Sequence, residues 1–155
     1  MSNRTRGELV AAVTATARRH HAAYTLFNQA MAEHLGLHPT DLQCVSLLAL
    51  EPGPRTTGEI AELTGLTSGS ATRLVDRLQK AGLAERHADA HDRRKMLVSL
   101  TSGRTPEIEA AWTTPGKAFD EALGDFTDDE LTVIERYLLR TTDVGAEQTA
   151  RLRTG

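Results

Sequence analysis

Two short helix patterns separated by a single glycine occupy residues 56–82 of this 155-residue chain. The run Thr56-Thr57-Gly58-Glu59 fits a Ser/Thr-x-x-Glu capping box, so a first helix begins here, and Gly65 is expected to end it. Thr67 or Ser68 then caps a second helix in which apolar residues recur along one face. These apolar positions are Ala71, Leu74, Val75 and Leu78. The spacing predicts a helix-turn-helix unit whose second helix has one buried face.

The opposite face of this second helix is polar, and small hydroxylated residues make up its first turn. Such a turn lets a helix approach base edges in the major groove of DNA closely. The polar positions are Ser70, Thr72, Arg73, Asp76, Arg77 and Lys80. Gly82 is the expected stop of the helix, after which residues 83–86 and 96–100 are expected to pair as strands around a charged tip, 89–95. The pattern predicts a winged helix-turn-helix and makes DNA binding the leading functional hypothesis.

The distribution of charge supports this hypothesis over a plain helix pair with a solvated hairpin. Runs of charge usually face water, and helix-turn-helix geometry also occurs in proteins that bind no DNA. The chain has a net charge of −3, but residues 52–104 hold nine Lys/Arg against six Asp/Glu, a net of +3. The remainder holds nine against fifteen, a net of −6. Positive charge is therefore concentrated where phosphates would lie.

Residues 52–101 resemble the DNA-binding core of the multiple-antibiotic-resistance regulator (MarR) family. The resemblance is carried by residues 70–78 (SATRLVDRL), by residues 80–86 (KAGLAER), and by the wing Asp92-Arg93-Arg94-Lys95 running into residues 98–101. It implies that a long first helix and the last two helices form an obligate dimer. It also implies that the second helix of the pair enters the major groove and that a wing arginine reaches the neighbouring minor groove.

The resemblance assigns roles to individual positions. Asp92 would brace the wing, and Arg94 would be the arginine in the minor groove. The expected DNA-binding residues are Thr67, Ser68, Ser70, Thr72, Arg73, Arg77, Asp92, Arg93, Arg94 and Lys95. Two recognition helices related by a two-fold axis are expected to read a pseudo-palindromic operator in double-stranded DNA, with half-sites about one helical turn, roughly 10 bp, apart.

The segments outside the lobe are expected to be helical. Residues 5–35 contain no proline and carry an apolar stripe that includes Phe27, Met31 and Leu35, which predicts one helix of about 30 residues, roughly 45 Å long. A helix of that length usually crosses to a partner subunit. A second, nearly apolar helix is expected to begin at Pro39 or Thr40 and to belong to the core.

Two further helices are expected after the wing. One begins at Pro106, and Pro115-Gly116 either bends it or divides it in two; we expect a bend. The last begins with a capping box in Phe126-Thr127-Asp128-Asp129-Glu130 and carries an apolar face to about Thr141. Gly145 weakens this helix, although residues 146–152 can extend it.

These elements predict a mainly α fold with a small β-hairpin wing. We expect one domain over residues 1–155, in which residues 39–104 form the winged helix-turn-helix lobe. The helical dimerisation region comprises residues 5–35 and 105–153.

Composition and missing motifs exclude several other classes. A content of 39% hydrophobic and 25% charged residues is that of a soluble globular protein. No run approaches the roughly 18–20 apolar residues of a membrane span and no export signal is recognisable, so we expect a cytoplasmic protein without a membrane partner. The sequence has no glycine-rich phosphate loop, no Gly-x-Ser-x-Gly elbow and no His-Glu-x-x-His helix, so we expect neither enzyme activity nor a cofactor.

Cys44 and the six histidines leave two alternatives open. As the only cysteine, Cys44 cannot form an internal disulfide, and a small buried hydrophobe is favoured over a reactive thiol in a redox sensor. The pairs His34/His38 and His87/His91 have a spacing at which two histidines share an ion, but we expect no metal site. A winged-helix module used only for protein contacts also remains an alternative to DNA binding.

The resemblance further implies that small aromatic or phenolic compounds often bind between the dimer helices and the winged lobe. His20, Tyr24 and Trp112 each combine apolar area with a polar tip, so they are the candidates for an effector pocket near the helix over 40–50. The alternative is that all three fill the dimer core. Together these expectations describe a transcriptional regulator, a repressor in our interpretation, that an effector releases from its operator.

Overall fold

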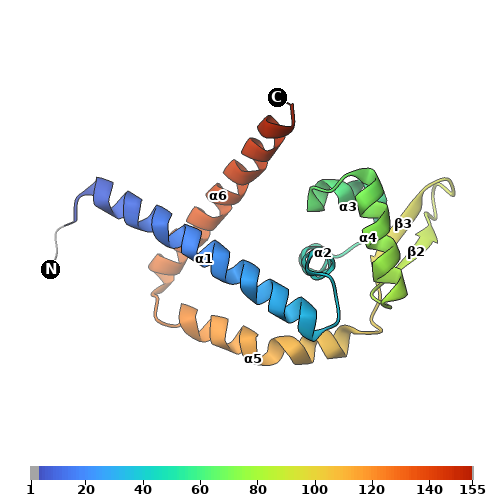
Figure 1. The fold of residues 1–155 in the computed structure, drawn as a ribbon, viewed down its shortest axis with the longest axis horizontal. Coiled ribbons are helices and arrows are strands. Elements are labelled where there is room, and N and C mark those ends of the chain that lie inside the picture. The colour runs from blue at the N-terminus through green and yellow to red at the C-terminus, as the bar shows by residue number, and fades with distance from the viewer. Residues whose placement is uncertain (1–3, 155) are drawn as a thin grey trace. The chain divides into compact units, whose positions relative to one another are not determined.

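The computed structural model describes residues 4–154, which form six helices and three strands (Figure 1). The elements in chain order are α1 (Arg6–His34), α2 (Pro39–Leu50), β1 (Arg55–Thr56), α3 (Thr57–Thr64), α4 (Ser68–Lys80), β2 (Ala84–Ala88), β3 (Met96–Leu100), α5 (Thr105–Leu123) and α6 (Asp128–Thr154). The predicted class, mainly α with a small β-hairpin, is confirmed.

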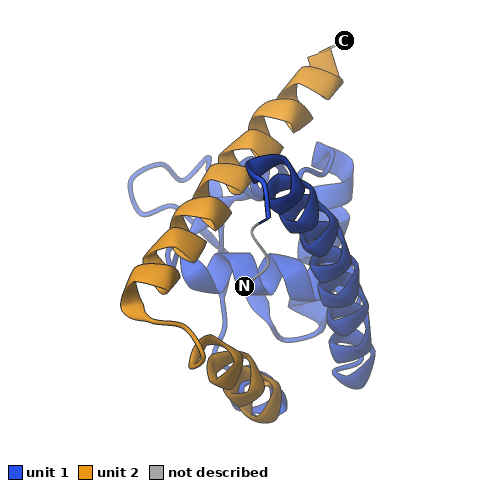
Figure 2. Ribbon diagram, turned by 90° about the vertical axis from the view of Figure 1, so that its left-hand side faces the viewer, with its two compact units in different colours: residues 1–111 blue, residues 112–155 orange. Residues whose placement is uncertain are grey.

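The chain forms two compact units, residues 1–111 and residues 112–155 (Figure 2). The first contains α1 to β3 and the start of α5. The second contains the rest of α5 and α6. The boundary between the two units falls inside α5.

The core of the first unit lies where α2, α3, α4 and the sheet meet. The predicted apolar face of α4 is fully buried, because Ala71, Leu74, Val75 and Leu78 are all 0% exposed. The side chains that pack against it from the other elements are Cys44, Val45, Leu48, Ile60, Leu83, Ala84 and Val98. The spacing of apolar residues thus determines which face of α4 turns inward and, by elimination, which face remains outside.

Local hydrogen bonds set the ends of the two short helices. Thr56 and Glu59 form the predicted capping box, with the Glu59 N–H donating to Thr56 Oγ1 at 3.2 Å and the Thr56 N–H donating to Glu59 Oε2 at 2.6 Å. Gly65 ends α3 in the left-handed region, at φ 70°. Thr67, rather than Ser68, caps α4, because its hydroxyl accepts the Ser70 N–H at 3.3 Å.

The exit from α4 explains why the first wing strand begins later than predicted. Gly82 adopts φ 71°, and the Leu83 N–H donates back to the Leu78 carbonyl at 2.9 Å. Leu83 therefore completes the helix end, and β2 spans Ala84–Ala88 instead of residues 83–86. Its register with β3 runs from Ala84 opposite Leu100 to Ala88 opposite Met96.

The sheet has a third strand that the sequence pattern did not reveal. The strand order is β1-β3-β2, all antiparallel, with Arg55 opposite Val98 and Thr56 opposite Leu97. A two-residue strand has no periodicity of its own, so only its pairing with β3 identifies it. This pairing places the start of α3 next to the wing.

The structure corrects the account of the apolar stripe on α1. Met31 and Leu35 are only 6% and 5% exposed, because the C-terminal part of α1 packs against α2 within the first unit. The exposed apolar residues of α1 lie earlier in the helix. They are Leu9, Val10, Val13, Tyr24 and Leu26.

The last two helices both run without a break past the residues that were expected to disturb them. α5 continues through Pro115, so this segment forms one helix and is not divided in two. α6 continues past Gly145 to Thr154, and none of its described residues is buried. Its capping box forms as predicted, since the Thr127 N–H donates to Glu130 Oε2 at 2.8 Å and the Glu130 N–H donates to Thr127 Oγ1 at 3.4 Å. Across residues 4–154, no helix combines the length and the apolar character that a membrane span requires.

Candidate nucleic-acid interface

The first turns of α4 expose a polar surface of small side chains. Ser68 and Thr72 are exposed, and their local bond runs from Thr72 Oγ1 to the Ser68 carbonyl at 2.9 Å. Ser70 is half-buried, and its hydroxyl accepts a hydrogen bond from Thr67 Oγ1 at 3.0 Å. Arg73 is exposed, and its guanidinium has no hydrogen bond or ion pair with any other residue of the described range 4–154. This surface can approach another molecule closely and offers it one uncommitted cation.

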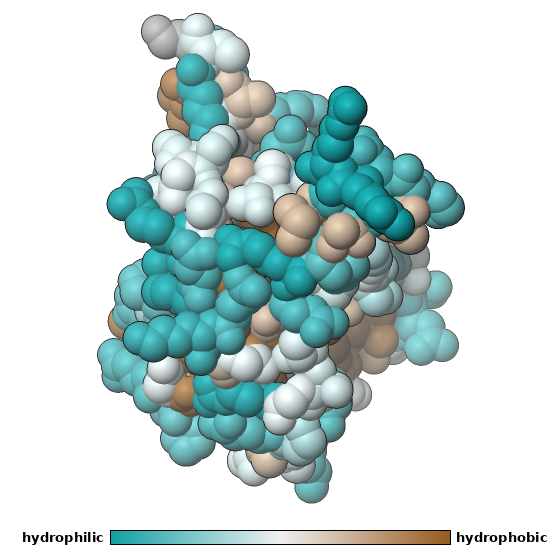
Figure 3. Space-filling model, turned by 90° about the vertical axis from the view of Figure 1, so that its right-hand side faces the viewer, coloured by the Kyte–Doolittle hydropathy of each residue, from teal (hydrophilic) through white to brown (hydrophobic). Residues whose placement is uncertain are grey.

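The wing supplies further positive charge beside this helix. Residues 93–95 at the tip are three consecutive exposed cations. The guanidiniums of Arg93 and Arg94 make no polar contact within the part of the chain that the structure describes. Figure 3 views the side of the molecule that carries α4, β2 and β3, and shows a mostly hydrophilic surface there.

Two aspartates give the wing tip a defined turn. Asp92 Oδ1 accepts the Arg94 N–H at 3.1 Å, and the Asp92 carbonyl accepts the Lys95 N–H at 2.8 Å. Asp89 Oδ1 accepts the His91 N–H at 2.7 Å, and this bond holds the pKa of the Asp89 carboxyl below its usual value. The turn therefore fixes the backbone from which the arginine side chains project.

Arg77 has a different environment from the one expected on an open DNA-binding face. Its Nε donates to Asp41 Oδ2 at 2.8 Å, and its Nη2 donates to Asp41 Oδ1 at 2.6 Å. These hydrogen bonds raise the pKa of the guanidinium, so it stays charged. The fork of Arg77 is thus committed to α2 rather than free for a phosphate.

A second arginine, which the sequence pattern did not single out, holds α4 from the wing side. Arg86 of β2 donates through Nη1 to Asp76 Oδ1 at 2.7 Å and also to Gln79 Oε1. Its Nη2 reaches the Thr72 carbonyl at 3.4 Å. Asp76, expected on the open face of α4, is therefore a partner of Arg86. The sequence pattern does not reveal this contact, because it depends on how β2 packs beside α4.

The candidate effector residues fall into different surroundings. A groove of about 350 Å³ lies between α1 and α2 in the first unit, and Tyr24 lines it. His20 does not line this groove, but its ring centroid lies 6.3 Å from that of Tyr24. Trp112 is half-buried and belongs to the second unit. The other lining residues are His21, Thr25 and Asn28 of α1 and Gln43, Ser46, Leu47 and Leu50 of α2.

Cys44 is fully buried in the core of the first unit. Desolvation, together with the nearby charge of Asp41, raises the pKa of its thiol to about 11. A buried thiol of this kind carries little thiolate at neutral pH and is a poor nucleophile. Within residues 4–154, no group of three His, Cys, Asp or Glu side chains is placed to hold a metal ion.

A buried helix-turn-helix core with an open small-residue turn and a braced cationic wing defines the winged helix-turn-helix class of DNA-binding proteins. The MarR family model matches residues 35–95. The HTH-type transcriptional regulator YcgE of Bacillus subtilis is 37% identical over 128 residues, which cover 83% of this chain and 82% of that protein. The chain belongs to the MarR family of transcriptional regulators.

Solved structures share the fold over most of the chain. A MarR family transcriptional regulator from Silicibacter pomeroyi is 25% identical, with a TM-score of 0.70, and the match covers 94% of this chain and 97% of that one. MepR from S. aureus, bound to an oligodeoxyribonucleotide, is 17% identical, with a TM-score of 0.57, and the match covers 84% of this chain and 96% of that one.

Proposed function

We propose that this MarR family regulator is a repressor that binds a pseudo-palindromic operator as a homodimer and is released by a small aromatic or phenolic compound. The observation that carries the proposal is the open first turn of α4, with Arg73 uncommitted, beside a braced wing whose Arg93 and Arg94 are also uncommitted. Uncommitted cations next to a small-residue turn suit a duplex, where bases lie between two rows of phosphates.

We assign the proposed DNA contacts from the surroundings of each side chain in the structure. Ser68, Ser70, Thr72 and Arg73 face the major groove, and Thr67 holds the turn that presents them. Arg93, Arg94 and Lys95 meet phosphates and the adjacent minor groove, while Asp92 keeps the wing turn in shape. The MepR structure, in which a protein of the same fold is bound to an oligodeoxyribonucleotide, supports DNA as the partner.

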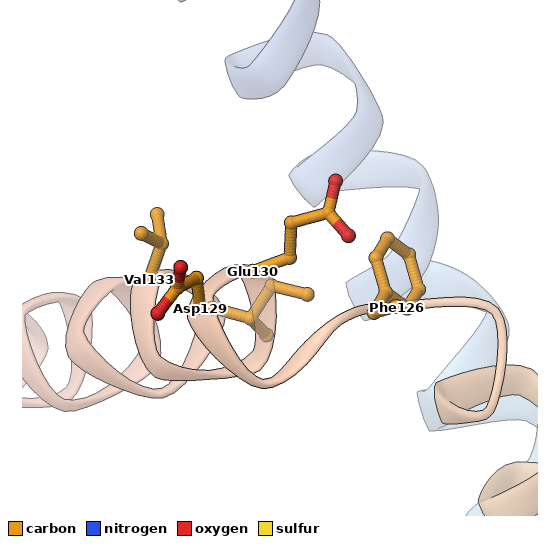
Figure 4. Close-up of a pocket in the computed structure, with 5 residues that line it drawn as sticks. Phe126, Asp129, Glu130 and Val133 are labelled. Carbon is orange, nitrogen blue, oxygen red and sulfur yellow. The ribbon is translucent and has the colours of Figure 1, made fainter.

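Exposed apolar residues support the homodimer. On α6 they include Val133, Leu138 and Leu139, which are 52%, 51% and 61% exposed. An open hollow of about 340 Å³ lies at the start of α6 and is lined by Phe126, Asp129, Glu130, Val133 and Ile134. Figure 4 shows four of these side chains with their labels. On α1, the large apolar residues Leu9, Val10, Val13 and Leu26 are exposed as well. Single exposed apolar residues are normal on a monomer, but this number of them indicates an interaction surface. A second copy of the chain removes this apolar area from water.

The groove between α1 and α2 supports an effector site. Tyr24 and Leu47 supply apolar area, and His21, Asn28, Gln43 and Ser46 supply hydrogen-bonding groups around it. His20, whose ring lies beside that of Tyr24, remains a proposed contributor. A compound bound there releases DNA only if it binds the form of the protein that cannot bind DNA more tightly than the form that can. A tenfold loss of DNA affinity needs a difference of roughly 1.4 kcal/mol between these two binding free energies.

The test begins with duplexes that the wild-type protein selects from a randomised pool, followed by protection mapping on genomic DNA flanking its own gene. We expect a protected pseudo-palindrome and an affinity that falls steeply with salt. A winged-helix module used only for protein contacts would show no salt-dependent affinity for any duplex. A protected site that overlaps a promoter, with transcription in vitro reduced by the protein, identifies a repressor, whereas increased transcription contradicts that assignment.

The effector is tested on the same complex. Aromatic acids are titrated while Trp112 fluorescence and operator affinity are measured in parallel. A compound that binds in the groove and leaves operator affinity unchanged contradicts effector release, although it does not affect the assignment of DNA binding.

A further inference from the structure

Asp41 is the one charged side chain of residues 4–154 that lies buried, with 3% of the residue exposed. It lies in the first turn of α2, where the helix N-terminus favours a negative charge. Removing a carboxylate from water is costly unless it is paired and hydrogen-bonded. Arg77 supplies both requirements.

The ion pair joins two helices that are far apart in the sequence. Residues 41 and 77 are 36 positions apart, and both N–H···O contacts, at 2.8 Å and 2.6 Å, are within normal hydrogen-bond length. A bidentate arginine–carboxylate pair fixes a direction as well as a distance, because the planar guanidinium must align with both oxygens. The pair therefore constrains the rotation of α4 about its own axis relative to α2.

The constrained part of α4 is the part that faces DNA in the proposed function. Arg77 follows Arg73 by four residues, so both lie on the same side of the helix, one turn apart. A rotation of α4 that breaks the Arg77–Asp41 pair would also turn Arg73 and Thr72 relative to the rest of the lobe. The distance of these two side chains from base edges thus depends on a contact that α4 makes with α2 and not with DNA.

We propose that Arg77 is a positioning residue for DNA reading, which acts through Asp41 by holding α4 in the orientation that presents Ser70, Thr72 and Arg73 to the bases. The inference rests on the proposed contact of α4 with DNA. It assigns to Asp41, which is buried and has the same sign of charge as DNA, a role in operator binding that electrostatics alone would not give it.

The test uses Asp41→Asn and Arg77→Lys in the full-length protein, with a duplex selected by the wild type and a scrambled duplex. Asp41→Asn makes the protein one charge more positive, which by charge alone strengthens duplex binding. Arg77→Lys keeps the charge but loses the planar fork. We expect each variant to bind the selected duplex about tenfold more weakly, the effect of one lost base contact.

Three features separate positioning from a phosphate contact. The salt slope stays at the wild-type value, because no phosphate contact is lost. Preference for the selected over the scrambled duplex falls, because base contacts are lost. The double variant is no weaker than the weaker-binding single variant, because both changes remove the same contact. Glu121→Gln, which removes a carboxylate from an exposed pair with Lys117, is the matched control and leaves affinity and preference unchanged.

The opposite pattern overturns the inference. If Arg77 contacts a phosphate, Arg77→Lys binds almost as the wild type does, Asp41→Asn binds equally or more tightly, and Arg77→Gln reduces the salt slope by about one unit. Absence of duplex binding by the wild type overturns the proposed function and this inference together, whereas wild-type affinity in Asp41→Asn overturns the inference alone. Should Asp41→Asn fail to fold, Arg77→Lys decides, because it keeps a cation beside Asp41 on a side chain that is 46% exposed.

Discussion

Arg86 of β2 donates a hydrogen bond of 2.7 Å to Asp76 of α4, and so joins the first strand of the wing to the recognition helix. The same guanidinium reaches the Thr72 carbonyl at 3.4 Å and the side chain of Gln79. The wing and the helix are therefore held as one piece. Two surfaces that are expected to contact neighbouring grooves of DNA keep a fixed separation in this arrangement.

Replacing Arg86 tests how much this contact contributes to stability. We expect Arg86→Ala to lower the free energy of unfolding by about 1 kcal/mol, because several hydrogen bonds are lost while the Asp76 partner is largely in water. Chemical denaturation measures the change. Lys117→Ala, which breaks an exposed pair on α5, is the control and is expected to change stability by only a few tenths of a kcal/mol.

Arg94 tests the wing contact. Arg94→Ala is expected to weaken binding to every duplex and to flatten the dependence of log affinity on log salt by about one unit. Binding measured over a salt series shows the slope directly. Lys117→Ala removes the same amount of charge away from the lobe and is expected to keep the wild-type slope. Identical slopes for Arg94→Ala and the wild type would remove the wing contact from the proposal.

Changes on the open turn of α4 are expected to differ in kind from the loss of Arg94. Arg73→Ala and Thr72→Ala should alter which sequences are selected from a randomised pool, because we propose that these side chains face base edges. Ser70→Ala is expected to act in the same way, with an added effect through the Thr67 hydroxyl that it holds. Selection that returns the wild-type sequence for all three variants contradicts a major-groove role for this turn.

The exposed apolar residues of α6 predict that the monomer does not persist. We expect sedimentation at micromolar concentration to show a dimer, and Leu138→Glu to shift it toward monomer, because a charge replaces a side chain that a second copy would cover. Ala90→Glu, which adds the same single negative charge at an exposed position of the wing tip, is the control for introducing an acidic residue. A stable, folded species of 16.8 kDa in the wild type would count decisively against the dimer.

The buried thiol of Cys44 makes a prediction about pH. Burial raises its pKa from 9.0 to about 11, so the folded state holds the proton more tightly than the unfolded chain does. The stability that this group contributes is fully present below pH 9 and is lost as the pH rises from 9 to about 11. Compared with Cys44→Ala, the wild type should therefore lose more stability over this range in denaturation experiments.

The same thiol separates a structural role from a redox sensor. In the native protein at neutral pH, Cys44 should react with thiol reagents only at the rate of unfolding, because it is fully buried. Rapid native-state labelling, or oxidation by dilute peroxide that changes operator affinity, would support the redox alternative instead.

Local signals in the sequence were sufficient for the helix-turn-helix itself. The Thr56/Glu59 capping box, the stops at Gly65 and Gly82, and the period of Leu74, Val75 and Leu78 all act within one or two turns of chain. Each is decided by neighbouring backbone groups or by one helix face, so a single sequence reveals it. The strand predicted over residues 96–100 has the observed bounds, because the alternating pattern of its own residues is enough to identify it.

Tertiary structure decided the partners of the charged side chains. Arg73 and Arg77 look alike in the sequence, one turn apart on the same polar face, yet Arg77 pairs with Asp41 of α2 while Arg73 stays uncommitted. Which of two equivalent cations finds a carboxylate depends on how α2 and α4 pack, and that packing is set by buried apolar residues elsewhere in the core. The sequence by itself determined where the helices of the lobe begin and end and which face of α4 is buried, whereas only the folded arrangement determined which residues on its outer face remain free to contact DNA.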